Sequence, residues 1–103
     1  MLEITRDDSA TKGRYVARLP GYPEAGELTF SRLGTKTVTA DHTGVPESLR
    51  GRGIALALVE RLVADARAED FKIVPLCPYI LAQLHRHPEW ADVIQIRGEI
   101  RGQ

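Results

Sequence analysis

The hydrophobic pattern of this chain changes its period at a segment that contains two glycines and two arginines, residues 50–55. Before residue 46, apolar and polar residues alternate in short segments, which is typical of strands with one buried face. After residue 53, apolar residues recur every three to four positions, which predicts an amphipathic helix. Short connections between the early segments favour an antiparallel meander. The chain is therefore expected to fold as an α/β protein.

Two predicted strands flank that helix. Residues 36–43 form the first, and residues 71–76 form the second, a short apolar run. One face of the first strand is expected to carry three residues: Val38, Ala40 and His42. A strand, a helix and a second strand in this order imply a right-handed crossover between parallel neighbours. Pro75 cannot donate to a ladder, which indicates an edge position, a bulge or a splayed neighbour.

Three further segments also have a predicted structure. Residues 7–13 are polar and predict a turn region between two early strands. Residues 79–87 predict a second helix, which Pro88 ends. Residues 97–103 are expected to form a short polar tail.

The first turn of the central helix is predicted to lack a side-chain cap. Ser48 can cap a helix, but Gly51 and Gly53 would then fall in its first turns, at about 1 kcal/mol each relative to alanine. If the helix begins nearer Gly53, no suitable side chain accepts from its first N–H groups. A bound phosphate can accept instead, helped by the helix dipole and by glycines that permit close approach. The alternative is a glycine-rich turn with two solvated arginines.

Two common phosphate motifs do not fit this segment. A Walker loop requires G-x-x-x-x-G-K-[ST], which does not occur in the sequence. The dinucleotide fingerprint G-x-G-x-x-G would begin at Gly51 but has Leu56 where its last glycine belongs.

Composition bounds the compartment and the partners. The 103 residues carry a formal net charge of +0 and one cysteine, Cys77. Balanced charge provides no strong field for nucleic acid or an anionic membrane, so neither is expected as a partner. A lone cysteine forms no internal disulfide, which fits a reducing compartment. With no signal-peptide pattern and no apolar run near 18 residues, a cytoplasmic protein is expected.

Several motifs resemble one enzyme family. Arg50, Gly53 and Ala55, read as R-x-x-G-x-A, resemble the acyl-CoA pyrophosphate loop of the GNAT acetyltransferase superfamily. Together with residues 41–46, and with Cys77-Pro78-Tyr79 followed by His87-Pro88-Glu89-Trp90, they resemble small, roughly domain-length GNAT-like proteins. These are predicted N-acetyltransferases, sometimes called the YjdJ type.

The resemblance covers residues 28–94 and implies one GNAT-like acyl-CoA-binding domain over residues 1–103. It implies a mostly antiparallel sheet with one parallel strand pair splayed around a CoA site, a central helix and a short C-terminal helix. Acetyl-CoA is the expected cosubstrate, without a metal. Pantetheine would pair with backbone near Thr43 and Val45, and the pyrophosphate would lie on residues 50–55, with charge-assisted contacts from the arginines. The expected cofactor-binding residues are Thr43, Val45, Arg50, Gly51, Arg52, Gly53, Ile54, Ala55 and Tyr79.

Two residues are candidates for the chemistry. His42 ends the first parallel strand and is a possible base, because imidazole titrates near neutral pH; the alternative is a histidine that hydrogen-bonds at a strand end. Cys77 ends the second and is a possible nucleophile, or else a small buried residue. Tyr79 packs against CoA or protonates the leaving thiolate. His85 and His87 do not share a helix face, so no metal site is expected.

The sequence thus predicts an acetyl-CoA-dependent acyltransferase whose acceptor is an amine, on a small molecule or on a protein lysine. The chain lacks the N-terminal helices that help larger GNAT enzymes form the acceptor site, and His42 stands where a glutamate base is usual. Two alternatives stay open: a CoA-binding module without turnover, and a protein-interaction domain. A monomer or a weak dimer is expected.

Overall fold

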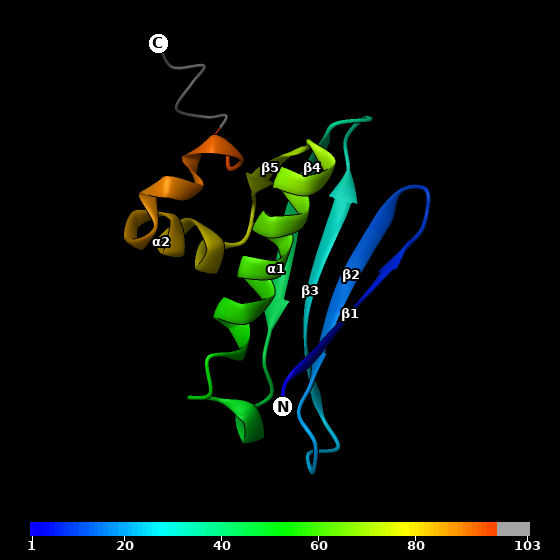
Figure 1. Cartoon of the computed structure of the whole chain (residues 1–103), viewed down its shortest axis with the longest axis vertical. Coiled ribbons are helices and arrows are strands. Elements are labelled where there is room, and N and C mark those ends of the chain that lie inside the picture. Colours follow the sequence, from blue (N-terminus) through cyan, green and yellow to red (C-terminus); the bar gives the residue numbers. More distant parts are fainter. Residues whose placement is uncertain (97–103) are drawn as a thin grey trace.

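The computed structural model describes residues 1–96; the predicted polar tail, residues 97–103, lies outside the described residues. A sheet has the strand order β1-β2-β3-β4-β5 (Figure 1). The strands are β1 (Glu3–Asp8), β2 (Lys12–Arg18), β3 (Ala25–Arg32), β4 (Thr37–Gly44) and β5 (Lys72–Pro75). Neighbours from β1 to β4 are antiparallel, and β4 pairs with β5 in parallel. The predicted mixed sheet with one parallel pair is confirmed, and the predicted turn at residues 7–13 is shorter because β1 and β2 extend into it.

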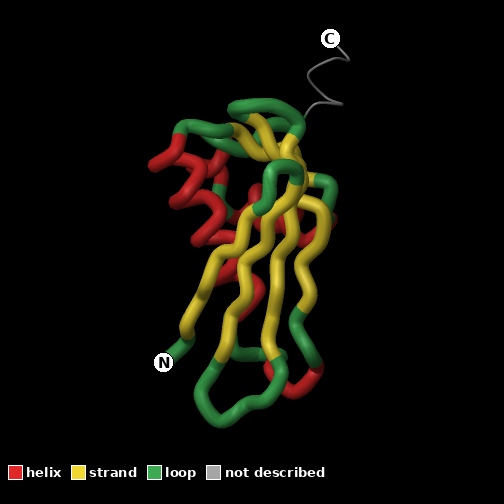
Figure 2. The backbone as a smooth tube through the Cα atoms, turned by 90° about the vertical axis from the view of Figure 1, so that its right-hand side faces the viewer, coloured by secondary structure: helices red, strands yellow, loops and turns green. Residues whose placement is uncertain are grey.

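Helix α1 (Ile54–Glu69) connects β4 to β5, and α2 (Pro78–Arg86) follows β5. Two short 3-10 helices, η1 (Glu47–Leu49) and η2 (Pro88–Asp92), complete the described elements. Figures 1 and 2 show α1 lying against one face of the sheet, with no helix of the described residues on the other face. Within residues 1–96, no helix is long and apolar enough to span a membrane.

The hydrophobic core lies between α1 and the sheet. The buried face of α1 consists of Ile54, Leu58, Val59, Leu62, Val63 and Ala66. It packs in one cluster with buried residues of β2, β3 and β4, among them Tyr15, Leu28, Phe30 and Ala40. Full burial of a leucine or valine side chain stabilises a fold by about 1.5–3 kcal/mol. The predicted apolar stripe therefore is the surface that holds α1 to the sheet.

A polar network fastens the C-terminal half of α1 to β1. The guanidinium of Arg6 donates to Asp65 at 3.1 Å and to Glu69 at 2.5 Å. The buried Tyr15 hydroxyl donates to Asp65 at 2.8 Å, and burial together with this carboxylate raises the pKa of Tyr15. The ion pair with Arg6 offsets the unfavourable position of an acidic residue, Glu69, at a helix C-terminus.

A β-bulge in β4 overturns one prediction from the sequence. Thr29 of β3 pairs with His42, whereas the next residue, Phe30, pairs with Ala40, so Asp41 is an extra residue in β4. An extra residue shifts the alternation of side chains by one position. Val38 and Ala40 are buried and His42 is exposed. The prediction that all three share one face is therefore wrong beyond Ala40.

The parallel strands part at this bulge. Their pairing ends at Ala40 and Pro75. The N–H groups of Leu76 and Cys77 both donate to the Ala40 carbonyl, at 3.0 and 3.1 Å, where the chain leaves the sheet. β4 continues to Gly44 beyond the last β5 pair, so its edge there faces a gap. Of the alternatives that Pro75 indicated, the edge position and the splayed neighbour are both observed, since β5 is also the last strand in the order.

Candidate functional site

The first turn of α1 begins at a glycine with left-handed backbone. Gly53 is the N-cap residue with φ 75°, and among the described residues no side chain caps it. Ser48 instead donates to Glu24 at 2.5 Å. Gly51 has φ 80°, a conformation that non-glycine residues rarely adopt. The prediction of an uncapped helix that starts near Gly53 is confirmed, and the alternative cap by Ser48 is wrong.

A cavity of about 220 Å³ adjoins this uncapped turn. It brings together the end of β4, η1, the first turn of α1 and the first turn of α2. The lining residues are Val45, Leu49, Arg50, Gly51, Gly53, Ile54, Ala55, Leu56 and Tyr79. Most of the expected cofactor-binding residues therefore surround one space.

Two further lining residues, Leu49 and Leu56, supply apolar walls and were not among the expected site residues. Both are signalled only by being apolar residues next to the glycine segment. Small-molecule sites are mostly lined by apolar groups with a few polar ones, and this cavity has that character.

Arg52, between η1 and α1, does not line the cavity and instead contacts Tyr22 on the loop between β2 and β3. Its guanidinium donates a short hydrogen bond to the Tyr22 hydroxyl and lies 4.7 Å from the centroid of that ring. Arg50 lines the cavity. Of the two arginines, Arg50 is thus the one whose position matches a phosphate on the helix N-terminus.

Thr43 and Cys77 face each other across the gap between the parallel strands. The Cys77 sulfur lies 3.6 Å from Thr43 Oγ1, and the cysteine is 6% exposed. Thr43 pairs with Leu28, which pairs in turn with Tyr15, the residue bonded to α1. Cross-strand partners point to the same side of a sheet. Because the Tyr15 side chain hydrogen-bonds to Asp65 of α1, the side chain of Thr43 also lies on the face that α1 covers.

His42 lies on the opposite face of the sheet. It pairs with Thr29, and its ring Nε2 sits so close over Gly44 that an added Cβ there would come within 2.9 Å. Among the described residues, no hydrogen bond joins His42 to Cys77, whose partner is Thr43. The structure thus brings Cys77 together with Thr43, and leaves His42 on the face without a helix.

Tyr79, in the first turn of α2, is half-buried in the wall of the cavity. Burial raises the pKa of its hydroxyl; the nearby Arg86 lowers it, and Cys77 and Glu60 raise it. The hydroxyl therefore stays protonated at neutral pH and can donate a proton or a hydrogen bond to a group in the cavity.

The same fold occurs in solved acetyltransferase-like structures. A GCN5-like protein from Staphylococcus aureus has a TM-score of 0.67 at 25% identity, covering 90% of this chain and 87% of that one. A ribosomal-protein-alanine N-acetyltransferase from Brucella melitensis has a TM-score of 0.59 at 22% identity, covering 85% and 64%. The second likeness is one of fold alone.

Sequence comparison gives the family. Protein NATD1 of Xenopus tropicalis is 35% identical over 75 residues, which are 73% of this chain and 69% of that protein. Protein NATD1 of Danio rerio is 34% identical over 83 residues, 79% and 76% of the two chains. Residues 14–93 match the family described as GCN5-related N-acetyl-transferase. The chain therefore belongs to the GCN5-related N-acetyltransferase family.

Proposed function

We propose that the protein transfers the acetyl group of acetyl-CoA to an amine, on a small molecule or on a lysine. The observation that carries this proposal is the uncapped N-terminus of α1, which opens into a cavity beside the gap between β4 and β5. Backbone N–H groups at a helix N-terminus bind phosphate without further partners. Family membership supports acyl transfer in general.

In this proposal the pyrophosphate of CoA binds the N–H groups of the first turn of α1. Gly51 and Gly53 leave room for it, because, apart from adjacent residues of the chain, no described atom lies within 4 Å of where their Cβ atoms would be. Arg50 adds a charge-assisted contact. The pantetheine arm then follows the free edge of β4, from Val45 toward Thr43. The adenosine lies outside, since a cavity of about 220 Å³ holds only part of such a ligand.

The transfer uses His42 as base and Tyr79 as acid. The amine nitrogen attacks the thioester carbonyl carbon, and His42 accepts the proton that the nitrogen loses. The bond between carbon and sulfur breaks, and the Tyr79 hydroxyl gives its proton to the sulfur, so that free CoA leaves. The exposed position of His42 and the protonated state of Tyr79 support these assignments.

A covalent route through Cys77 is the second candidate. The Cys77 thiolate would attack the thioester, CoA would leave with a proton, and the amine would then take the acetyl group from the cysteine sulfur. The position of Cys77 directly before α2, next to Thr43 at the gap between the parallel strands, favours this route. Among the described residues no base lies beside the Cys77 sulfur, which favours direct attack of the amine on the thioester.

Calorimetry with CoA, followed by intact-mass analysis with acetyl-CoA, tests the proposal. We expect CoA to bind, and acetyl groups to appear on an added amine. If the protein binds CoA and transfers nothing to any amine, it is a CoA-binding module. Equal binding of sulfate, phosphate and CoA would indicate a protein-interaction domain with an incidental anion site.

The variant Cys77→Ala separates the two routes. Transfer at the wild-type rate would exclude the covalent route, whereas loss of transfer together with an acetyl adduct on wild-type Cys77 would establish it. Thr43→Val is the matched control, because it removes the neighbour of the sulfur and leaves the thiol in place.

A further inference from the structure

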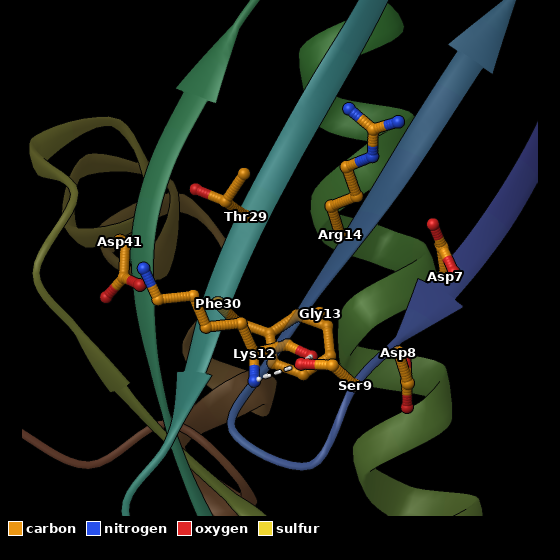
Figure 3. Close-up of a pocket in the computed structure, with 9 residues that line it drawn as sticks. All are labelled: Asp7, Asp8, Ser9, Lys12, Gly13, Arg14, Thr29, Phe30 and Asp41. Atoms are coloured by element: carbon orange, nitrogen blue, oxygen red, sulfur yellow. Dashed lines mark hydrogen bonds between the residues drawn. The ribbon is translucent and has the colours of Figure 1, made fainter.

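The face of the sheet without a helix carries a second cavity, of about 500 Å³ (Figure 3). Figure 3 shows it across the strands with α1 behind them, so it lies on the opposite side from the first cavity. Small-molecule sites typically measure about 300–1,000 Å³. Its polar walls include Lys12, Arg14, Thr29 and Asp41. Thr29 is also the cross-strand partner of His42, which places the proposed base beside this cavity.

Asp41, the extra residue of the bulge, is held in a fixed orientation in the wall. Ser31 donates to one carboxylate oxygen at 2.5 Å, and Thr39 donates to the other at 2.7 Å. Both donors are neutral, so they orient the carboxylate without cancelling its charge. Within residues 1–96, no Lys, Arg or His forms an ion pair with Asp41 at 4 Å or less.

Lys12 supplies the opposite charge. Figure 3 shows its side chain extending across the cavity on the side of Asp41, yet the described ion pairs do not include it. Two other charged residues of the wall have partners: Asp8 pairs with Arg6 and Arg32, while Arg14 pairs with a glutamate of β3 at 3.5 Å.

Asp7 lies at the far edge, on β1 (Figure 3). Asp41 directly precedes His42 in β4, so it is the carboxylate of the cavity wall that is next to His42. The cavity thus presents a negative group beside the proposed base and a positive group on the neighbouring side.

We propose that this cavity binds the acceptor, and that the acceptor is a small molecule with an anionic group as well as its amine, in the manner of an amino acid. Asp41 holds the ammonium group next to His42, and Lys12 holds the anionic group. The inference rests on the proposed function. The thioester comes from the side of α1 and the acceptor from the open face, and the two meet at the gap where β4 and β5 part.

Amide chemical shifts during titration with matched probes test this assignment. The probes are phenylalanine with phenethylamine and lysine with cadaverine, pairs in which only the carboxylate differs. With CoA present, we expect both amino acids to shift the amides of Thr29 and Asp41, with at least tenfold lower Kd than their decarboxylated partners. Equal Kd values within each pair, or no shifts on the open face at tens of millimolar probe, would overturn the inference.

Two variants test which residue binds the carboxylate of the acceptor and which binds its ammonium group. Lys12→Gln should abolish the preference for the amino acid in each pair, and Asp41→Asn should weaken both members by tenfold or more. The matched controls are Arg18→Gln and Glu3→Gln, exposed positions on β2 and β1 outside the cavity, which should change nothing. If Asp41→Asn fails to fold, the Lys12 variant still decides, since a retained preference would contradict the assignment.

Calorimetry with CoA on the same samples separates this inference from the proposed function. CoA should bind the wild type and all four variants alike, because none of the changed residues lines the first cavity. Failure of the wild type to bind CoA would count against the proposed function. An unshifted open face in protein that binds CoA would overturn only the acceptor site.

Discussion

Replacing Gly53 by alanine tests two roles of this glycine. It adopts a left-handed backbone conformation, and it leaves space for the phosphate in the proposed CoA site. At φ 75° an L-residue costs about 1–2 kcal/mol. Apart from adjacent residues of the chain, no described atom lies within 4 Å of the added methyl group, so packing contributes no further cost. We expect the free energy of unfolding to fall by about 1–2 kcal/mol. For a domain of this size, the midpoint of thermal unfolding should fall by about 4–8 °C per kcal/mol.

CoA binding should suffer beyond this loss of stability. Gly53 lines the cavity, so the added methyl group projects toward the space that the proposal gives to the pyrophosphate. A hydrogen bond to a charged group contributes about 1.5–3 kcal/mol. Loss of one such bond therefore raises the Kd of CoA by about tenfold or more, because 1.4 kcal/mol is a factor of ten.

Gly21→Ala is the matched control for this prediction. Gly21 has φ 89° and equally open surroundings, and it lies on the turn after β2, outside the cavity. Both variants should lose similar stability in thermal unfolding, and only Gly53→Ala should lose affinity in calorimetry with CoA. If the two variants bind CoA as the wild type does, the phosphate does not lie against Gly53, and the reasoning is refuted.

Three further changes test other parts of the structure. Asp65→Asn should lower the free energy of unfolding by about 1–3 kcal/mol in urea denaturation, because it weakens the bonds from Arg6 and buried Tyr15; an unchanged value would contradict this. Arg6 holds the pKa of Asp8 below its usual 3.8, so this carboxylate stabilises the fold above that pH and loses its contribution as pH falls through the lowered pKa. Asp8→Asn should therefore show a shallower loss of thermal stability below pH 4 than the wild type, and parallel curves would rule this out. Tyr79→Phe should lower kcat by about a hundredfold and change CoA affinity little, and an unchanged kcat would remove Tyr79 as the acid.

The features that sequence could predict are those that local chemistry decides. The start of α1 follows from two glycines and the lack of a capping side chain, and both act within one turn. The position of β5 at the edge and its parting from β4 are two of the alternatives that Pro75 indicates, because it has no N–H to donate. The buried stripe of α1 follows from the spacing of apolar residues. Each of these could be predicted without knowing any partner strand.

The features that sequence missed depend on distant partners. The bulge at Asp41 arises from the pairing of β4 with β3, while the alternation within residues 36–43 is regular. Its consequence is large, because it moves His42 to the open face and away from Cys77. The position of Arg52 likewise depends on Tyr22, a residue on a loop remote in sequence.

The central claim is that the pyrophosphate of CoA completes the exposed N–H groups at the start of α1. Amide chemical shifts of labelled protein during CoA titration test it most directly. The claim predicts that the largest saturable shifts fall on residues 50–56. Shifts that gather elsewhere, or unmoved amides in this segment at saturating CoA, would contradict it.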